Sequence, residues 1–113
     1  MRITVLTVPD CPHASLAQER IELALDGQAA EVQFVEVADE SQAAQLGMAG
    51  SPTVLLHGTD PFAVPGAVAS VSCRLYRGPD GRTEGAPSVA DLRRVLHAVE
   101  TGADCDRPSM DAV

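Results

Sequence analysis

Segments with the periodicity of strands and of helices follow one another along this chain in an order that few folds accommodate. Residues 2–8 alternate weakly and are rich in β-branched side chains, which predicts a strand. Residues 9–12 (Pro-Asp-Cys-Pro) break that strand, and apolar residues then recur at helical spacing from Ala14 to Asp26, before Gly27. A second β-rich run covers Glu31–Val37. Because parallel strands need a crossover connection, this order predicts a right-handed, parallel β-α-β unit.

The second half of the chain is predicted to begin with a short helix and a buried strand. Asp39 and Ser41 are alternative N-caps for a helix that ends at Leu46. Residues 53–57 form a continuous apolar run, which is typical of a strand buried on both faces. Residues 58–70 contain two prolines and no clean period, so we expect a long loop there.

A further strand is expected to pair with this buried strand as a hairpin. Residues 71–77 alternate between apolar and polar side chains, and a Gly-Pro-Asp-Gly turn follows at 78–81. The side chains expected to face inward are Val71, Cys73 and Leu75.

The last helix has the clearest pattern. Ser88 is predicted to cap it, with Asp91 three residues on, and Gly102 to end it. Its apolar stripe consists of Val89, Leu92, Leu96 and Val99. Residues 103–113 carry three Asp and no periodicity, which predicts a mobile acidic tail. We therefore expect one domain over residues 1–102, with the element order β-α-β-α-β-β-α.

Composition excludes several classes of protein. The 113 residues carry a formal charge of −8, which argues against a binder of nucleic acid or of an anionic membrane. No apolar stretch approaches the ~20 residues that span a bilayer, and the N-terminus does not resemble a signal peptide, so we expect a cytoplasmic protein. Without Trp, and with one Tyr and two Phe, the core is expected to be aliphatic.

The cysteines are the candidates for chemistry. Cys11, Cys73 and Cys105 cannot all pair within one chain, and no two have the spacing of a zinc site, so we predict neither a disulfide scaffold nor a cofactor. Cys11 stands where the first strand hands over to the first helix, and Pro12 suits a first helical turn. The free amide groups and the dipole of a helix N-terminus favour a thiolate there, and a protonated His13 would add to this effect. The alternative is a cysteine that only caps the helix.

These motifs resemble those of the thioredoxin-like superfamily. The matching residues are Cys-Pro-His-Ala at 11–14, after the first strand, and Ser-Pro-Thr at 51–53, before the third. The resemblance covers roughly residues 1–102. It implies an α/β fold with a mixed central sheet and helices on both faces. It also implies that Cys11 is the nucleophile and that Pro52 is a cis-proline lining the substrate groove.

One position departs from the dithiol pattern of that superfamily. The second cysteine would be residue 14, which is Ala14, so the two-cysteine exchange cycle cannot run within the motif and a monothiol site is expected. Cys73 is the possible second thiol if the 58–70 loop returns the chain to the Cys11 end of the sheet. Otherwise Cys73 is a small buried hydrophobe. Cys105, in the predicted tail, is expected to be incidental.

A second, narrower resemblance covers residues 50–56, 60–62 and 72–76. These segments are similar to small actinobacterial thioredoxin-like proteins labelled alkylmercury lyase. That likeness implies two soft thiolates, Cys11 and Cys73, that hold the metal. Asp10 or Asp60 would be the acid that protonates the departing carbon.

Three functions therefore compete at this point. The first is a thiol-redox protein in which Cys11 attacks a disulfide, of a protein or a small molecule, and Cys73 or an external thiol resolves the product. The second is an enzyme or carrier for soft metals or organomercurials that uses Cys11 and Cys73 together. The third is an interaction module that has kept the fold and lost the reaction.

Overall fold

The computed structural model describes residues 1–100, except for the side chain of Glu100. The predicted tail at 103–113, Cys105 and the predicted helix end at Gly102 lie outside the described residues. In chain order the elements are β1 (Arg2–Thr7), α1 (Ala14–Leu25), β2 (Glu31–Glu36), α2 (Glu40–Leu46), β3 (Ala49–Ser51), β4 (Thr53–Leu56), β5 (Ser70–Cys73), β6 (Tyr76–Arg77), β7 (Thr83–Glu84) and α3 (Val89–Glu100).

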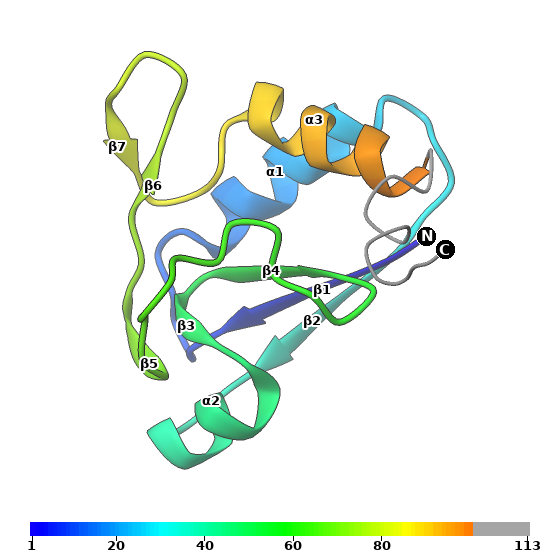
Figure 1. Cartoon of the computed structure of the whole chain (residues 1–113). Helices are drawn as coiled ribbons and strands as arrows, with labels where there is room; N and C mark the ends of the chain where they lie inside the picture. The colour runs from blue at the N-terminus through cyan, green and yellow to red at the C-terminus, as the bar shows by residue number, and fades with distance from the viewer. Residues whose placement is uncertain (101–113) are drawn as a thin grey trace, which may run out of the picture.

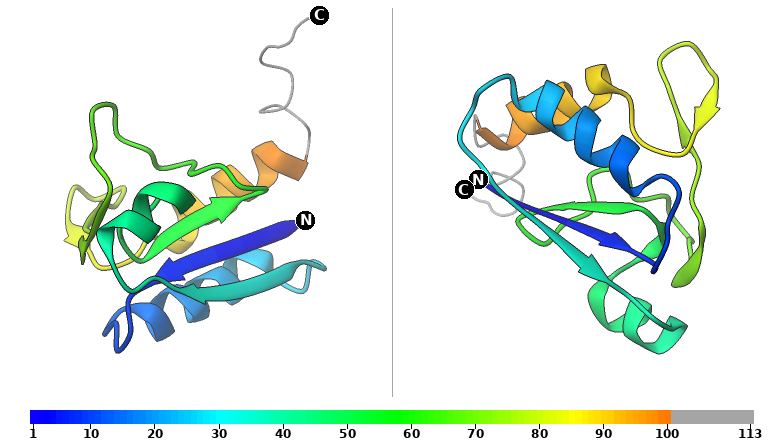
Figure 2. Two further views of the ribbon diagram at one scale, coloured as in Figure 1. Left: turned by 90° about the horizontal axis from the view of Figure 1, so that it is seen from below. Right: turned by 180° about the vertical axis from the view of Figure 1, so that it is seen from behind.

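The main sheet has three strands in the order β2-β1-β4. Strands β1 and β2 are parallel, as the β-α-β pattern predicts, whereas β4 runs antiparallel to β1. The sheet is therefore mixed. Two small two-stranded sheets, β3-β5 and β6-β7, lie beside it. Both flank the end of the sheet to which the β1 arrow points (Figure 1 and the right view of Figure 2).

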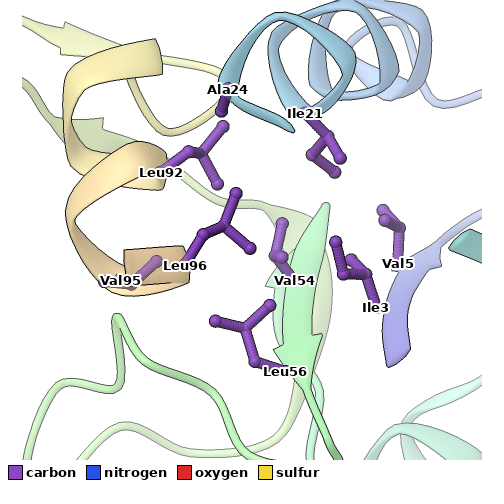
Figure 3. Packing of buried hydrophobic residues seen from close by; sticks show 9 residues of the cluster. All are labelled: Ile3, Val5, Ile21, Ala24, Val54, Leu56, Leu92, Val95 and Leu96. Carbon is purple, nitrogen blue, oxygen red and sulfur yellow. The ribbon is translucent and has the colours of Figure 1, made fainter. Parts of the chain in front are cut away.

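Helices cover both faces of the main sheet. Helices α1 and α3 lie side by side on one face, and α2 lies on the other (Figure 1). The side chains between the sheet and the helix pair are aliphatic (Figure 3), namely Ile3, Val5, Ile21, Ala24, Val54, Leu56, Leu92, Val95 and Leu96. The α2 face carries a smaller cluster of Leu6, Val37, Ala43, Met48 and Leu55. Alternate residues of β1 and β4 thus serve the two clusters, as the two-residue period of a strand requires.

Capping residues define the helix ends. Asp39 is the N-cap of α2, where its carboxylate accepts a hydrogen bond from the Gln42 backbone N–H at 2.8 Å. Of the two alternative caps, Asp39 is thus the one used. The Ser88 hydroxyl accepts from the Asp91 N–H at 3.0 Å at the start of α3, as predicted. Helix α1 ends at Leu25, and both Asp26 and Gly27 adopt left-handed conformations, with φ angles of 50° and 83°.

The predicted hairpin between residues 53–57 and 71–77 is wrong. After β4 the chain turns back at His57 and Gly58, whose φ angles are 50° and 85°, and Leu56 and Thr59 exchange two backbone hydrogen bonds. Pro61 then stops the ladder, because proline has no N–H to donate. The chain continues as the predicted long loop, and β5 pairs in parallel with β3 instead.

The predicted inward face of residues 71–77 is correct for Val71, which packs against the cluster on the α2 face, but wrong for Cys73 and Leu75. Cys73 is exposed and Leu75 is 63% exposed, whereas the Tyr76 side chain is buried and that of Arg74 is only 9% exposed. The segment divides into β5 and β6 at residues 74–75. Arg74 and Tyr76 face inward because buried partners satisfy their polar groups. An alternation of apolar and polar residues cannot predict such hydrogen bonds and ion pairs.

None of the helices within residues 1–100 is long and apolar enough to cross a lipid bilayer.

Replacing Gly50 tests the close approach of β3 and β5. Gly50 has a φ of +117°, and a Cβ there would lie 2.7 Å from the Arg74 Cβ and 3.2 Å from the Ser72 carbonyl oxygen. We expect Gly50→Ala to lower the free energy of unfolding by about 2–4 kcal/mol, the sum of backbone strain and overpacking. Gly66→Ala is the control, because Gly66 also has a positive φ but nothing within 4 Å of the added Cβ. Equal losses for the two variants in urea denaturation would contradict this reading.

Candidate functional site

Cys11 lies in the turn between β1 and α1 and is half-buried. Its N–H donates to the Val8 carbonyl at 3.2 Å, and its own carbonyl accepts from the Ala14 N–H at 3.3 Å. His13 is the N-cap of α1, so Cys11 precedes the helix by one tight turn. Pro12 is exposed and stands before the helix, not in its first turn as predicted.

Ser51 connects the Cys11 thiol to the sheet. The buried Ser51 hydroxyl donates a hydrogen bond to the Cys11 Sγ at 3.0 Å, and the Val8 N–H donates to the same Ser51 oxygen at 3.1 Å. A serine hydroxyl has one proton to donate and two lone pairs that accept, so Ser51 can accept from the Val8 amide and donate to the sulfur at the same time. Cys11 and Ser51 are 40 positions apart in the chain, so no sequence pattern pointed to this contact.

Pro52, the predicted cis-proline, follows Ser51 and is buried. The Ser51–Pro52 peptide bond is cis, the isomer that the superfamily resemblance implies. The segment is held on both sides of the proline. The Thr53 hydroxyl donates to the Gly50 carbonyl at 2.6 Å, and the Tyr76 hydroxyl donates to the Pro52 carbonyl.

Arg74 is the centre of a buried polar network behind Pro52. Its guanidinium forms an ion pair with Asp60 at 2.7 Å and donates to the Phe62 carbonyl at 2.7 Å and to the Thr53 hydroxyl at 3.3 Å. It also lies over the Tyr76 ring, 4.5 Å from the ring centroid, and Phe62 packs edge-on against the same ring. Asp60, one of the two predicted acids, is therefore engaged in holding Arg74.

Cys73 reaches the Cys11 end of the sheet by way of the 58–70 loop. Its Cα pairs with that of Ser51 in the parallel ladder of β3 and β5, and the Arg74 N–H donates to the Ser51 carbonyl at 3.0 Å. A functional Cys73 required that the 58–70 loop return the chain to the Cys11 end of the sheet, and the loop does so. The alternative of a buried Cys73 is wrong, because the residue is exposed.

His13 and Asp10 flank Cys11 in the chain with different surroundings. The His13 ring packs against Gly85 so closely that a Cβ on this glycine would lie 2.3 Å from the ring. Its Nδ1 is buried without a hydrogen-bond partner among the described residues. Asp10 is exposed and has a φ of 62°.

Within residues 1–100, no three His, Cys, Asp or Glu side chains gather in the way a multi-ligand metal site requires.

No protein-family model matches this chain, and a search of the curated proteins finds no match either.

Removing the charge of Asp60 tests the buried network. Breaking a buried ion pair on one side leaves an uncompensated charge, so we expect Asp60→Asn to lower the free energy of unfolding by about 3–5 kcal/mol. The control is Asp80→Asn, because Asp80 pairs with Arg82 at 3.8 Å on the surface. Exposed pairs contribute less than about 1 kcal/mol, so the control is expected to unfold like the parent chain. Urea denaturation of both variants measures the difference.

Tyr76 provides a spectroscopic check of the same network. Burial raises its pKa above the ordinary value of 10.0; Arg74 lowers it and Asp60 raises it by smaller amounts. Because Tyr76 is the single tyrosine and the chain has no Trp, absorbance near 295 nm follows this residue alone. We expect no phenolate in the folded protein at pH values where the urea-unfolded chain, with a midpoint of about 10, is half ionised.

The sign of the linked stability change follows. Above pH about 10 the folded state holds a proton that the unfolded chain has lost, so stability falls as pH rises further. A folded-state titration that coincides with the unfolded one would contradict the buried position of Tyr76.

Proposed function

We propose that this protein carries out thiol–disulfide chemistry with Cys11 as the attacking thiol. The observation that supports the proposal is the hydrogen bond from the buried Ser51 hydroxyl to the Cys11 sulfur. A hydroxyl proton aimed at sulfur stabilises the thiolate, which is the nucleophilic form, and also the sulfur that leaves when a mixed disulfide is resolved. The half-buried Cys11 remains open to a substrate.

The substrate reaction begins with attack of the Cys11 thiolate on one sulfur of a disulfide. The sulfur–sulfur bond of the substrate breaks, a mixed disulfide forms on Cys11, and the second substrate sulfur leaves as a thiolate. Ala14 occupies the position of a helix-borne resolving cysteine, so the second step needs a thiol from another element or from outside the chain.

Alkylation kinetics test the role of Cys11 and Ser51. We expect iodoacetamide at pH 7 to modify Cys11 faster than Cys73, with each site followed by peptide mass. A hydrogen bond to a charged group contributes about 1.5–3 kcal/mol, so Ser51→Ala is expected to slow Cys11 modification by about 10–100-fold. Ser72→Ala, which removes an exposed hydroxyl from β5, is the control and leaves the rate unchanged. If Cys11 reacts faster than Cys73 but Ser51→Ala does not change the Cys11 rate, Ser51 has no role in the reactivity of Cys11.

Soft-metal or organomercurial binding by Cys11 and Cys73 is the second candidate. It is favoured by the pairing of Cys73 with Ser51, whose hydroxyl contacts Cys11. Because Asp60 is engaged with Arg74, the exposed Asp10 is the acid left to protonate a departing carbon.

Mercury titration tests the second candidate. In a Cys105→Ser background, two-thiolate binding predicts one tightly bound Hg²⁺ per chain, with the ultraviolet absorption of a bis-thiolate complex. Cys11→Ser and Cys73→Ser would both abolish it. Disulfide exchange, in contrast, loses its first step only in Cys11→Ser.

A further inference from the structure

Ser51 has a cysteine on each side. Its hydroxyl contacts the Cys11 sulfur at 3.0 Å, and its Cα is the ladder partner of the Cys73 Cα. Neighbouring strands lie about 4.8 Å apart, so Cys73 stands one strand spacing from the residue that touches Cys11. A disulfide requires Cα atoms separated by about 4.4–6.8 Å, so joining Cys11 to Cys73 requires a shift that brings their Cα atoms within that range.

The β5 segment has the local structure for such a shift. Its register against β3 is irregular, because the three residues Ala49–Ser51 of β3 pair with the four residues Ser70–Cys73 of β5. A bulge of this kind leaves a residue outside the ladder and changes the direction of nearby side chains. The preceding loop is exposed from residue 63 to residue 69, and Cys73 itself is exposed. Cys73 is therefore reachable by solvent and follows both the irregular register and the exposed loop.

We propose that Cys73 is the resolving thiol for Cys11, an inference that rests on the proposed function. Once Cys11 carries a mixed disulfide, the Cys73 thiolate attacks the Cys11 sulfur. A Cys11–Cys73 disulfide forms, the bond to the substrate breaks, and the substrate sulfur leaves as a thiolate. Over both steps one substrate disulfide is reduced to two thiols and the two cysteines are oxidised to one disulfide, with their protons passing to the released sulfurs.

This assignment compensates for Ala14 through a different element. The resolving thiol comes from β5 and not from the first turn of α1, so the pair is formed by segments more than sixty residues apart. The network of Arg74 with Asp60 and the Phe62 carbonyl holds the residue after Cys73 in place. A covalent bond between Cys11 and Cys73 would thus link the turn before α1 to an anchored segment.

A single-turnover reaction with an aromatic disulfide tests the assignment. The reduced full chain, carrying Cys105→Ser, is mixed anaerobically with one equivalent of 5,5′-dithiobis(2-nitrobenzoate). We expect two equivalents of thionitrobenzoate, the second released at a rate independent of protein concentration, and a Cys11–Cys73 linked peptide in the product. Cys73→Ser is expected to release one equivalent, to keep the adduct on Cys11 and to slow the second release at least about 100-fold, the loss of an intramolecular reaction.

Two further variants make the result specific. The double variant Cys73→Ser/Leu75→Cys moves the thiol two positions along the same segment, so that it no longer stands opposite Ser51. We expect this variant not to restore release of the second thionitrobenzoate. If Cys73→Ser still releases two equivalents at the parent rate, or if the parent chain keeps the adduct, Cys73 is not the resolving thiol, although Cys11 chemistry stands. If Cys11→Ser reacts like the parent chain, the proposed function itself fails.

Discussion

The buried ion pair between Arg74 and Asp60 is the interaction on which the arrangement of the site depends. Through it and its neighbours, three stretches far apart in sequence meet: the cis-proline segment, the start of the long loop and the β5–β6 junction. A charge pair with side chains about one-tenth exposed is stable only when hydrogen bonds satisfy the remaining donors. Here Thr53 and the Phe62 carbonyl accept, and the Tyr76 ring covers the guanidinium.

This network determines where the thiols lie. With Arg74 turned inward, Tyr76 reaches the Pro52 carbonyl and the Arg74 amide reaches the Ser51 carbonyl. Ser51 is thereby fixed between β5 and the end of β1, and its hydroxyl is directed at Cys11. Ser51, which touches the Cys11 sulfur, is thus positioned by Arg74 and Tyr76, two residues for which no contact with that sulfur is observed. The contact between the Ser51 hydroxyl and the Cys11 sulfur is therefore preorganised by packing at a distance.

Much of the fold could be predicted from local patterns. The parallel β1-α1-β2 unit, the cap and apolar stripe of α3 and the buried β4 all follow from periodicity and from capping residues. The hairpin could not be predicted correctly, because β3 and β4 were both possible partners of β5 and the local pattern of residues 71–77 does not distinguish them. At the site, sequence motifs were enough to predict Cys11 and Pro52 as site residues. The role of Ser51 was not, since its partner is 40 positions away.

Although strands β3 and β7 were not predicted, the sequence by itself determined the aliphatic core, the order of the three helices with strands β1, β2 and β4, and the isolation of Cys11 from a second cysteine in its own motif. Each of these is a local property, set by side-chain period, by caps or by the residue at a single position. Only the tertiary structure decided that Arg74 and Tyr76 face inward, that Cys73 is exposed and that Cys73 pairs with Ser51. These outcomes depend on whether buried polar groups find partners, and those partners come from segments that meet only when the chain is folded.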